Sequence, residues 1–198
     1  MIKKDLIVKL RQRTGAGIME CKEALKETEG KIEEAIVYLR KKGLSKAKKR
    51  ASRKAEHGAI SAYIHTGGKV GALIEVNCET DFVSRNETFQ KFVKDMAMQI
   101  VAANPAYLKR KDVPLKVIEK EKDILSSQVD SKKPEEILEK ILQGKLEKYF
   151  KEICLLEQPF IKNPEITVEE HLHQHIARIG EKLEIKRFSR FKLGEEID

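Results

Sequence analysis

Residues 56–78 read EHGAISAYIHTGGKVGALIEVNC, and within this stretch the spacing of the apolar residues changes from a helical to a strand period. Apolar and polar residues alternate in two runs. The apolar positions of the first run are Ile60, Ala62 and Ile64, and those of the second are Ile74, Val76 and Cys78. The runs flank Gly67-Gly68, and glycine takes positive φ at little steric cost. The stretch therefore predicts a β-hairpin.

The chain before the hairpin predicts three short amphipathic helices. Their apolar stripes are Leu6, Ile7 and Leu10, then Ile18, Cys21 and Leu25, then Ile32, Ala35, Ile36 and Leu39. We expect Thr14-Gly15-Ala16-Gly17 to form the first connection, and Gly30 and Gly43 to end the second and third helices. The sequence thus predicts a three-helix module over residues 1–43, followed by a basic linker over residues 44–56.

Helices dominate the chain after the hairpin. They are expected from Asn86 to Asn104-Pro105, over residues 114–129, over residues 134–157, and from Thr167, the first residue of a capping box, to Gly180. Pro159 and Pro164 are expected to bracket a loop. Strand alternation returns over residues 183–193, where Phe188 is out of phase and indicates a β-bulge. Together these elements predict the α+β class, with a core domain over residues 57–198 built on a small antiparallel sheet.

The net charge is +8, and the excess of Lys and Arg lies in the first quarter of the chain, mostly at Lys41-Lys42 and over residues 46–54. A basic stretch of this kind is typical of proteins that bind nucleic acid or an acidic protein surface. A solvated helix or linker is the simpler alternative. The stretch has no interleaved aromatic residues, which weakens the nucleic-acid interpretation but leaves a nucleic-acid-binding protein as the competing hypothesis.

Several features point to a cytoplasmic protein without membrane contact. No apolar run approaches the roughly 18–20 residues that a membrane span requires, and the start of the chain lacks a signal-peptide pattern. Cys21, Cys78 and Cys154 are far apart and form no CxxC pair, which argues against a disulfide framework or a zinc knuckle. Cys21 and Cys78 fall on apolar stripes, so we interpret them as core residues.

The sequence offers no candidate catalytic site. It contains no GxGxxG, Walker, GxSxG or HExxH motif. His171 and His175 share one face of a predicted helix, as a zinc site requires, but no third ligand is evident, and Cys154 has no visible histidine partner. We expect a protein that is not an enzyme and that uses no metal or cofactor.

Thr80-Asp81-Phe82-Val83 connects the hairpin to the next predicted helix and places an acid beside a large aromatic side chain. Two interpretations are open at this point. In the structural one, Phe82 and Val83 fold back into the core and Asp81 bonds local amides. In the functional one, the segment is presented to a partner by the rigid elements on either side, as binding residues on loops commonly are.

Several motifs in series resemble the bacterial elongation factor Ts family. They are residues 10–17 (LRQRTGAG), 19–25 (MECKEAL), 76–83 (VNCETDFV), 149–152 (YFKE), 158–160 (QPF) and 187–188 (RF). Their number and order make the resemblance specific, and it extends over essentially the whole chain. The chain is similar to the short form of the family, without the duplicated core half and the C-terminal helical appendage of longer members.

The resemblance implies a guanine nucleotide exchange factor for elongation factor Tu, the GTPase that carries aminoacyl-tRNA to the ribosome. It implies an N-terminal module of the ubiquitin-associated type, which docks through Arg11, Ile18 and Met19; the family more often has Met at the position of Ile18. Thr80, Asp81, Phe82 and Val83 would act near the partner's magnesium and nucleotide. Short relatives can pair as homodimers, so a homodimer is a further expectation, whereas direct contact with nucleic acid is not expected.

Overall fold

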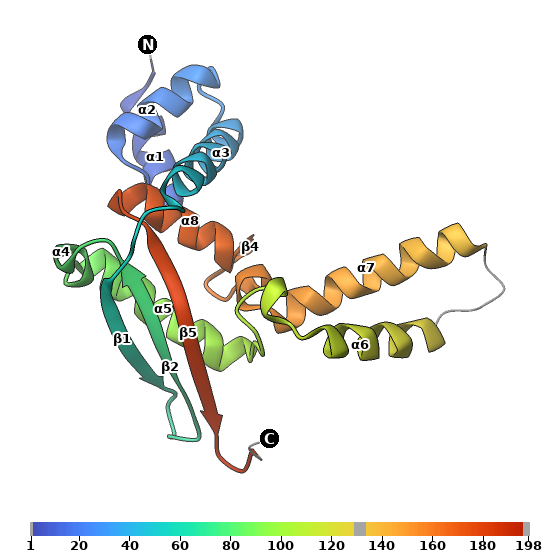
Figure 1. The fold of residues 1–198 in the computed structure, drawn as a ribbon. Helices are drawn as coiled ribbons and strands as arrows, with labels where there is room; N and C mark the ends of the chain where they lie inside the picture. The colour runs from blue at the N-terminus through green and yellow to red at the C-terminus, as the bar shows by residue number, and fades with distance from the viewer. Residues whose placement is uncertain (1, 129–133, 196–198) are drawn as a thin grey trace. The chain divides into compact units, whose positions relative to one another are not determined.

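The structure is a computed structural model that describes residues 2–128 and 134–195. It divides into two compact units, one made of Met1–Met98 with Glu169–Asp198 and the other of Gln99–Val168. The first unit contains the N-terminal helices and a three-stranded sheet, and the second contains a long helical hairpin (Figure 1). Within the described ranges, no helix is both long enough and apolar enough to cross a membrane.

Three helices open the first unit, as predicted: α1 (Lys4–Thr14), α2 (Ile18–Glu27) and α3 (Ile32–Arg50). Gly15 ends α1 in the left-handed conformation, with a φ of 67°, and its N–H donates to the Arg11 carbonyl. The three helices share a core of fully buried residues, namely Leu10, Cys21, Ala24, Leu25 and Ala35. The predicted apolar stripes therefore pack on one another.

The prediction that Gly43 ends the third helix is wrong. Gly43 is buried within α3, where a Cβ would lie 3.8 Å from the Ala177 Cβ and from the His173 carbonyl oxygen, both in α8 (Val168–Ile179). Gly43 therefore lies where α3 faces α8, and the helix continues to Arg50 into the segment that was expected to be a linker. The boundaries of the three domains, after residues 43 and 56, stay predictions.

The predicted hairpin is confirmed. It consists of β1 (His57–Ile64) and β2 (Val70–Cys78), which pair antiparallel. Gly67 and Gly68 in the connecting turn have φ values of 93° and 68°, which glycine alone adopts readily. β5 (Leu183–Lys192) pairs antiparallel with β2 and gives the strand order β1-β2-β5.

A β-bulge interrupts the pairing of β5 with β2. Glu75 pairs with Arg187 and Val76 with Ile185, so one residue of β5, Lys186, has no partner in the register. The bulge expected from the phase of Phe188 is present, two positions earlier, and it explains why the apolar alternation of this strand changes phase.

The two faces of the sheet differ in what covers them. The buried face carries Ala72, Ile74, Val76, Cys78, Leu183 and Ile185. The helix α5 (Glu87–Ala103) runs along this face (Figure 1), and in the first unit its Phe89, Phe92, Val93, Met96 and Ala97 are fully buried. The opposite face exposes large apolar side chains, namely Ile60, Ile64, Leu73 and Phe191.

The second unit is built around the antiparallel helices α6 (Leu115–Ser127) and α7 (Glu135–Ile153). Val113, Phe150 and Cys154 form one buried cluster of this unit. Arg110, in the short helix η1 (Arg110–Asp112), donates to the carboxylates of Glu147 and Glu157 at 2.5–2.6 Å. The end predicted for the first of these helices, residue 129, lies outside the described residues.

The helix predicted over residues 134–157 ends earlier, at Ile153. The Leu155 N–H donates to the Tyr107 carbonyl and the Leu156 N–H to the Leu108 carbonyl, so these residues cannot continue the helix. A 3-10 turn, η2 (Leu155–Glu157), follows. The expected loop between the two prolines contains a small hairpin, β3 (Pro159–Phe160) and β4 (Asn163–Thr167), which the sequence analysis did not predict.

Candidate functional site

The segment Thr80-Asp81-Phe82-Val83 contributes to a single helical turn, α4 (Asp81–Ser84), which begins three residues after the end of β2 at Cys78. Thr80 is its N-cap, and the Thr80 hydroxyl accepts a hydrogen bond from the Val83 N–H at 3.4 Å. Ser84 is buried, and its hydroxyl donates to the Asp81 carbonyl oxygen at 2.7 Å. The turn, called the 80–83 loop below, is thus closed by its own side chains.

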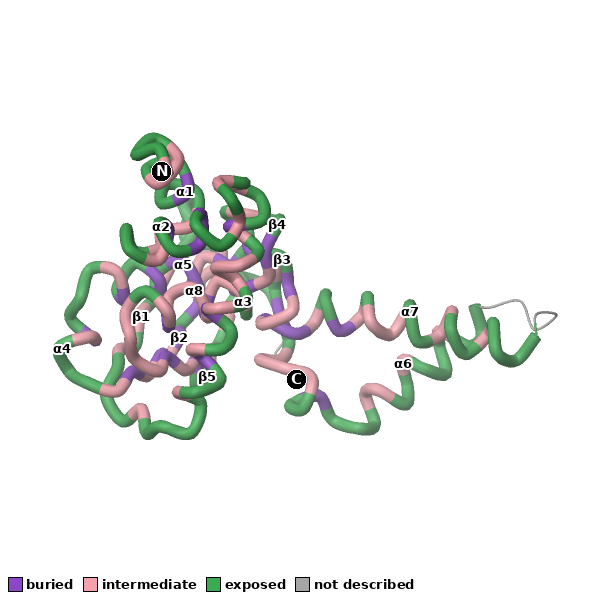
Figure 2. Tube along the Cα trace, turned by 90° about the horizontal axis from the view of Figure 1, so that it is seen from above, coloured by how far each residue is buried: buried purple, intermediate pink, exposed green. Residues whose placement is uncertain are grey.

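Phe82 projects from the 80–83 loop into solvent. It is 90% exposed, more than any other large apolar residue within residues 2–128 and 134–195. The interpretation in which Phe82 folds back into the core is therefore wrong. Val83 is half-buried and anchors the turn, whereas Asp81 is exposed and lies 2.7 Å from the Arg85 guanidinium. Figure 2 shows the exposed character of the chain around α4.

Two residues outside the exposed tip fix the backbone of the 80–83 loop. Glu181 accepts from the Thr80 N–H at 3.0 Å and from the Thr80 hydroxyl at 2.7 Å. The Cys78 thiol donates to the Thr80 carbonyl oxygen at 3.1 Å, and burial raises its pKa to about 11, so the donor stays protonated at neutral pH. Glu181 was missed by the sequence analysis because no local spacing links it to a residue 101 positions away.

The residues expected to dock the partner lie on the exterior of the N-terminal helices. Arg11 is exposed, as are Ile18 and Met19, with 55% and 72% of their surface accessible. Arg11 and Ile18 line a groove of about 1240 Å³, and Met19 lies outside its lining. Val8, 54% exposed, also lines the groove, although the motif did not indicate it.

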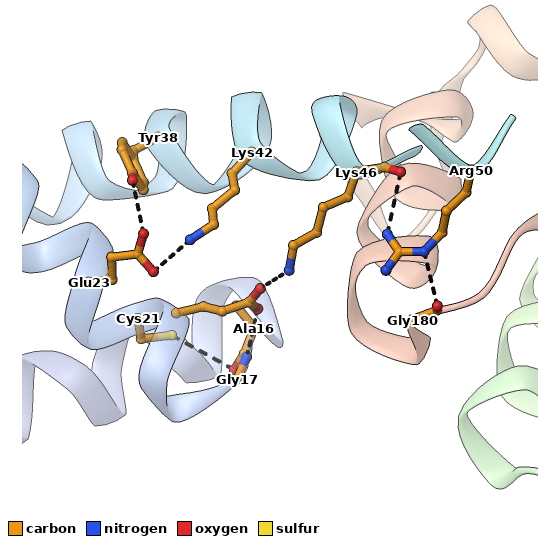
Figure 3. Close-up of polar contacts among 10 residues, drawn as sticks. Ala16, Gly17, Cys21, Glu23, Tyr38, Lys42, Lys46, Arg50 and Gly180 are labelled. Carbon is orange, nitrogen blue, oxygen red and sulfur yellow. Dashed lines mark hydrogen bonds and ion pairs between the residues drawn. The ribbon is translucent and has the colours of Figure 1, made fainter. Parts of the chain in front are cut away.

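Part of the basic segment is engaged in contacts within the protein, whereas Lys41, Lys48 and Lys49 are exposed. Lys42 reaches Glu23 at 2.6 Å, and Lys46 pairs with Glu20 of α2. Arg50 donates to the Gly180 carbonyl at 3.0 Å (Figure 3). Several cations of this segment therefore have acidic or carbonyl partners in the fold, and the expectation that the protein makes no direct contact with nucleic acid stays a prediction.

The histidines of α8 pack as an aromatic cluster. The His171 and His175 ring centroids are 4.4 Å apart, and both rings lie against Phe92, at 5.7 and 4.8 Å. Burial lowers the pKa of His175, which favours the neutral ring at pH 7. Among the residues that the structure describes, no group of three or more His, Cys, Asp or Glu side chains is placed to hold a metal ion.

A sequence model of the family described as Elongation factor TS matches residues 4–195. Elongation factor Ts of Heliobacterium modesticaldum is 54% identical over 198 residues, which cover all of this chain and 92% of that protein. The Carboxydothermus hydrogenoformans protein of the same name is 55% identical, over all of this chain and 91% of the relative. That of Caldanaerobacter subterraneus is 52% identical over the full length of both.

Proposed function

Because the chain belongs to the elongation factor Ts family, we propose that it is the guanine nucleotide exchange factor for elongation factor Tu. In this proposal the Asp81-Phe82 tip of the 80–83 loop perturbs the magnesium and nucleotide site of the GTPase and promotes release of GDP. The protein binds and deforms its partner, makes no covalent change to it, and works in the cytoplasm, where polypeptides are elongated.

The observation that carries the proposal is the exposure of Phe82 on a rigid turn. An aromatic side chain that is 90% exposed while its own backbone is closed by hydrogen bonds is prepared to insert into another surface. Burying such a side chain contributes about 1.5–3 kcal/mol. The entropy cost of ordering the 80–83 loop offsets little of this free energy, because the loop is already fixed before it contacts the partner.

Phe82 alone does not account for efficient exchange. Speeding release by three to five decades requires roughly 4–7 kcal/mol of differential stabilisation. The remainder is supplied by the N-terminal module, residues 1–43, through Arg11, Ile18 and Met19. The combined surface must also bind the partner with a deformed nucleotide site more tightly than the intact form, since equal affinity for both states shifts nothing.

Asp81 adds an electrostatic contribution. Its carboxylate is exposed next to Phe82, so insertion of Phe82 brings a negative charge close to the site where a magnesium ion and phosphates are held. A carboxylate there competes for the cationic and hydrogen-bonding groups that hold the nucleotide. Thr80 and Val83 act by holding this pair of side chains in place.

A second copy of the chain is a further partner in this proposal. The outer face of the three-stranded sheet presents Ile60, Ile64, Leu73 and Phe191, each between 48% and 69% exposed. Exposed apolar side chains that are adjacent on one sheet favour a protein interface. Glu75 and Arg187 form an ion pair on the same sheet, 2.6 Å apart. Sedimentation equilibrium checks the homodimer: Leu73→Lys should shift the mass to that of one chain, and a monomeric wild-type protein would reject it.

Release of a fluorescent GDP analogue from purified elongation factor Tu tests the function. Wild-type protein should accelerate release in a saturable manner at substoichiometric concentration, as a recycling exchange factor does. An unaccelerated rate at any concentration would reject the proposal. Weak binding to the GTPase without acceleration would also count against it.

A further inference from the structure

We infer that Glu181 is a positioning residue for nucleotide exchange, and that residues 180–182 tie the 80–83 loop to the C-terminal end of α3. The inference rests on the proposed function and deepens it, because it assigns the residue that sets the direction of Phe82. Glu181 lies in the connection between α8 and β5, outside every motif of the sequence analysis.

The contact between Glu181 and Thr80 uses both oxygens of one carboxylate. One oxygen accepts from the Thr80 N–H at 3.0 Å and the other from the Thr80 hydroxyl at 2.7 Å. Two hydrogen bonds to a single residue fix its orientation as well as its position. Since Thr80 is the N-cap of α4, its orientation sets that of the turn that carries Phe82.

The next residue, Lys182, holds the end of β2 that leads into the loop. The Lys182 N–H donates to the Glu79 carboxylate at 2.6 Å, and its ammonium group donates to the Arg53 carbonyl at 3.0 Å. Arg53 in turn pairs with Glu79 at 3.3 Å. Glu79 and Thr80, the two residues between β2 and α4, are therefore both held by residues 181–182.

Residue 180 connects the same segment to α3. The Arg50 Nε donates to the Gly180 carbonyl oxygen at 3.0 Å, and its guanidinium also reaches the Lys46 carbonyl within α3 (Figure 3). Gly180 has a φ of 87°, a conformation that glycine adopts readily and that ends α8. Through Gly180, which contacts α3, and Glu181, which contacts Thr80, this short segment links α3 to the 80–83 loop.

This arrangement predicts how Glu181 acts. The N-terminal module contacts the partner through Arg11, Ile18 and Met19, which do not depend on Glu181, so docking affinity should survive its loss. Phe82 would then sample several directions and would have to be ordered during insertion, which costs free energy at that step. Loss of Glu181 should lower the maximal rate of GDP release and leave the half-saturating concentration nearly unchanged.

Saturation curves of GDP release from elongation factor Tu, recorded with full-length variants, test the inference. Glu181→Ala should lower the plateau about tenfold, because two hydrogen bonds to a charged group are lost. Glu181→Gln should recover part of the plateau, since its amide oxygen still accepts one of them. Glu195→Ala is the matched control: Glu195 also uses both oxygens, on Arg190 at 3.0 Å, but follows the other end of β5.

Amide hydrogen exchange of the free protein provides a readout that does not depend on the partner. In Glu181→Ala the Thr80 and Val83 amides should exchange faster, while the buried part of α5 keeps its protection. The inference would be overturned if Glu181→Ala reached the same maximal rate of GDP release as wild type. It would also be overturned if Glu195→Ala lowered that rate as much as Glu181→Ala does. If wild-type protein does not accelerate release, the proposed function fails, and unchanged exchange at Thr80 would separately show that Glu181 does not hold the turn.

Discussion

The Arg85 guanidinium lies 2.7 Å from the Asp81 carboxylate, one helical turn away, and both side chains are more than half exposed. Exposed ion pairs of this kind contribute only about 0–1 kcal/mol to stability. The pair therefore leaves the Asp81 charge available to a partner.

Replacing Asp81 should separate function from stability. Asp81→Asn is expected to slow GDP release roughly tenfold or more, because a charged acceptor is lost at the contact, and to change the free energy of unfolding by less than about 1 kcal/mol. Release kinetics and urea unfolding measure the two effects. Arg85→Gln serves as the control for the ion pair itself. If Asp81→Asn promoted GDP release at the wild-type rate, Asp81 would have no role in the site.

Gly43 should tolerate a methyl group. A Cβ there would lie 3.8 Å from its nearest neighbours in α8, which is ordinary van der Waals contact. Gly43→Ala should therefore stabilise the protein by about 0.5–1 kcal/mol, because alanine loses less backbone entropy in a helix. Thermal unfolding measures the change. Gly58→Ala is the contrasting variant, since its Cβ would lie 2.2 Å from the Val76 carbonyl oxygen and must destabilise.

Acid should weaken the second unit through Glu147. Hydrogen bonds from Arg110 hold the pKa of this carboxyl below its ordinary value. A group whose pKa is lowered by folding stabilises the folded state above its unfolded pKa, about 4.3, and loses that contribution as the pH falls through the lower folded value. Arg110→Met should thus be less stable than wild type at pH 7, and the difference should shrink below about pH 4. A difference independent of pH would contradict this assignment.

The three thiols should resist modification in the folded protein. Cys21, Cys78 and Cys154 are free and buried. Burial raises the pKa of all three thiols, to about 11 for Cys78 and Cys154, so each is protonated at pH 8 and is a poor nucleophile. Ellman's reagent should react with none of them until denaturant is added, and then with all. Rapid reaction of the native protein would show that a cysteine is accessible.

Local pattern accounts for what the sequence predicted well. The hairpin follows from alternation around two adjacent glycines, and α1 and α2 from apolar stripes that end at turn-forming residues. The extension of α3 was missed because a glycine inside a helix that faces another helix cannot be distinguished, in sequence, from one that ends a helix. The exposure of Phe82 was implied only by the family resemblance, since from local pattern alone an aromatic residue beside a strand packs inward or projects outward depending on tertiary contacts.

Long-range hydrogen bonds account for most of the features that the sequence did not predict. Thr80 was identified by its motif, but Glu181, which holds it, is separated from it by 101 residues. In the second unit, α7 ends early because Tyr107 and Leu108 compete for the backbone of the residues after Cys154. Both effects arise from segments that meet only in the folded chain.

The plateau rate of GDP release with Phe82→Ala tests the central claim most directly. The variant should be folded by circular dichroism, since a side chain that is 90% exposed contributes little to the core. Its plateau should fall roughly 10- to 150-fold, which corresponds to losing about 1.5–3 kcal/mol of aromatic burial. Leu115→Ala, which removes an apolar side chain that is 75% exposed in the second unit, should behave as wild type. A Phe82→Ala plateau equal to that of wild type would contradict the account.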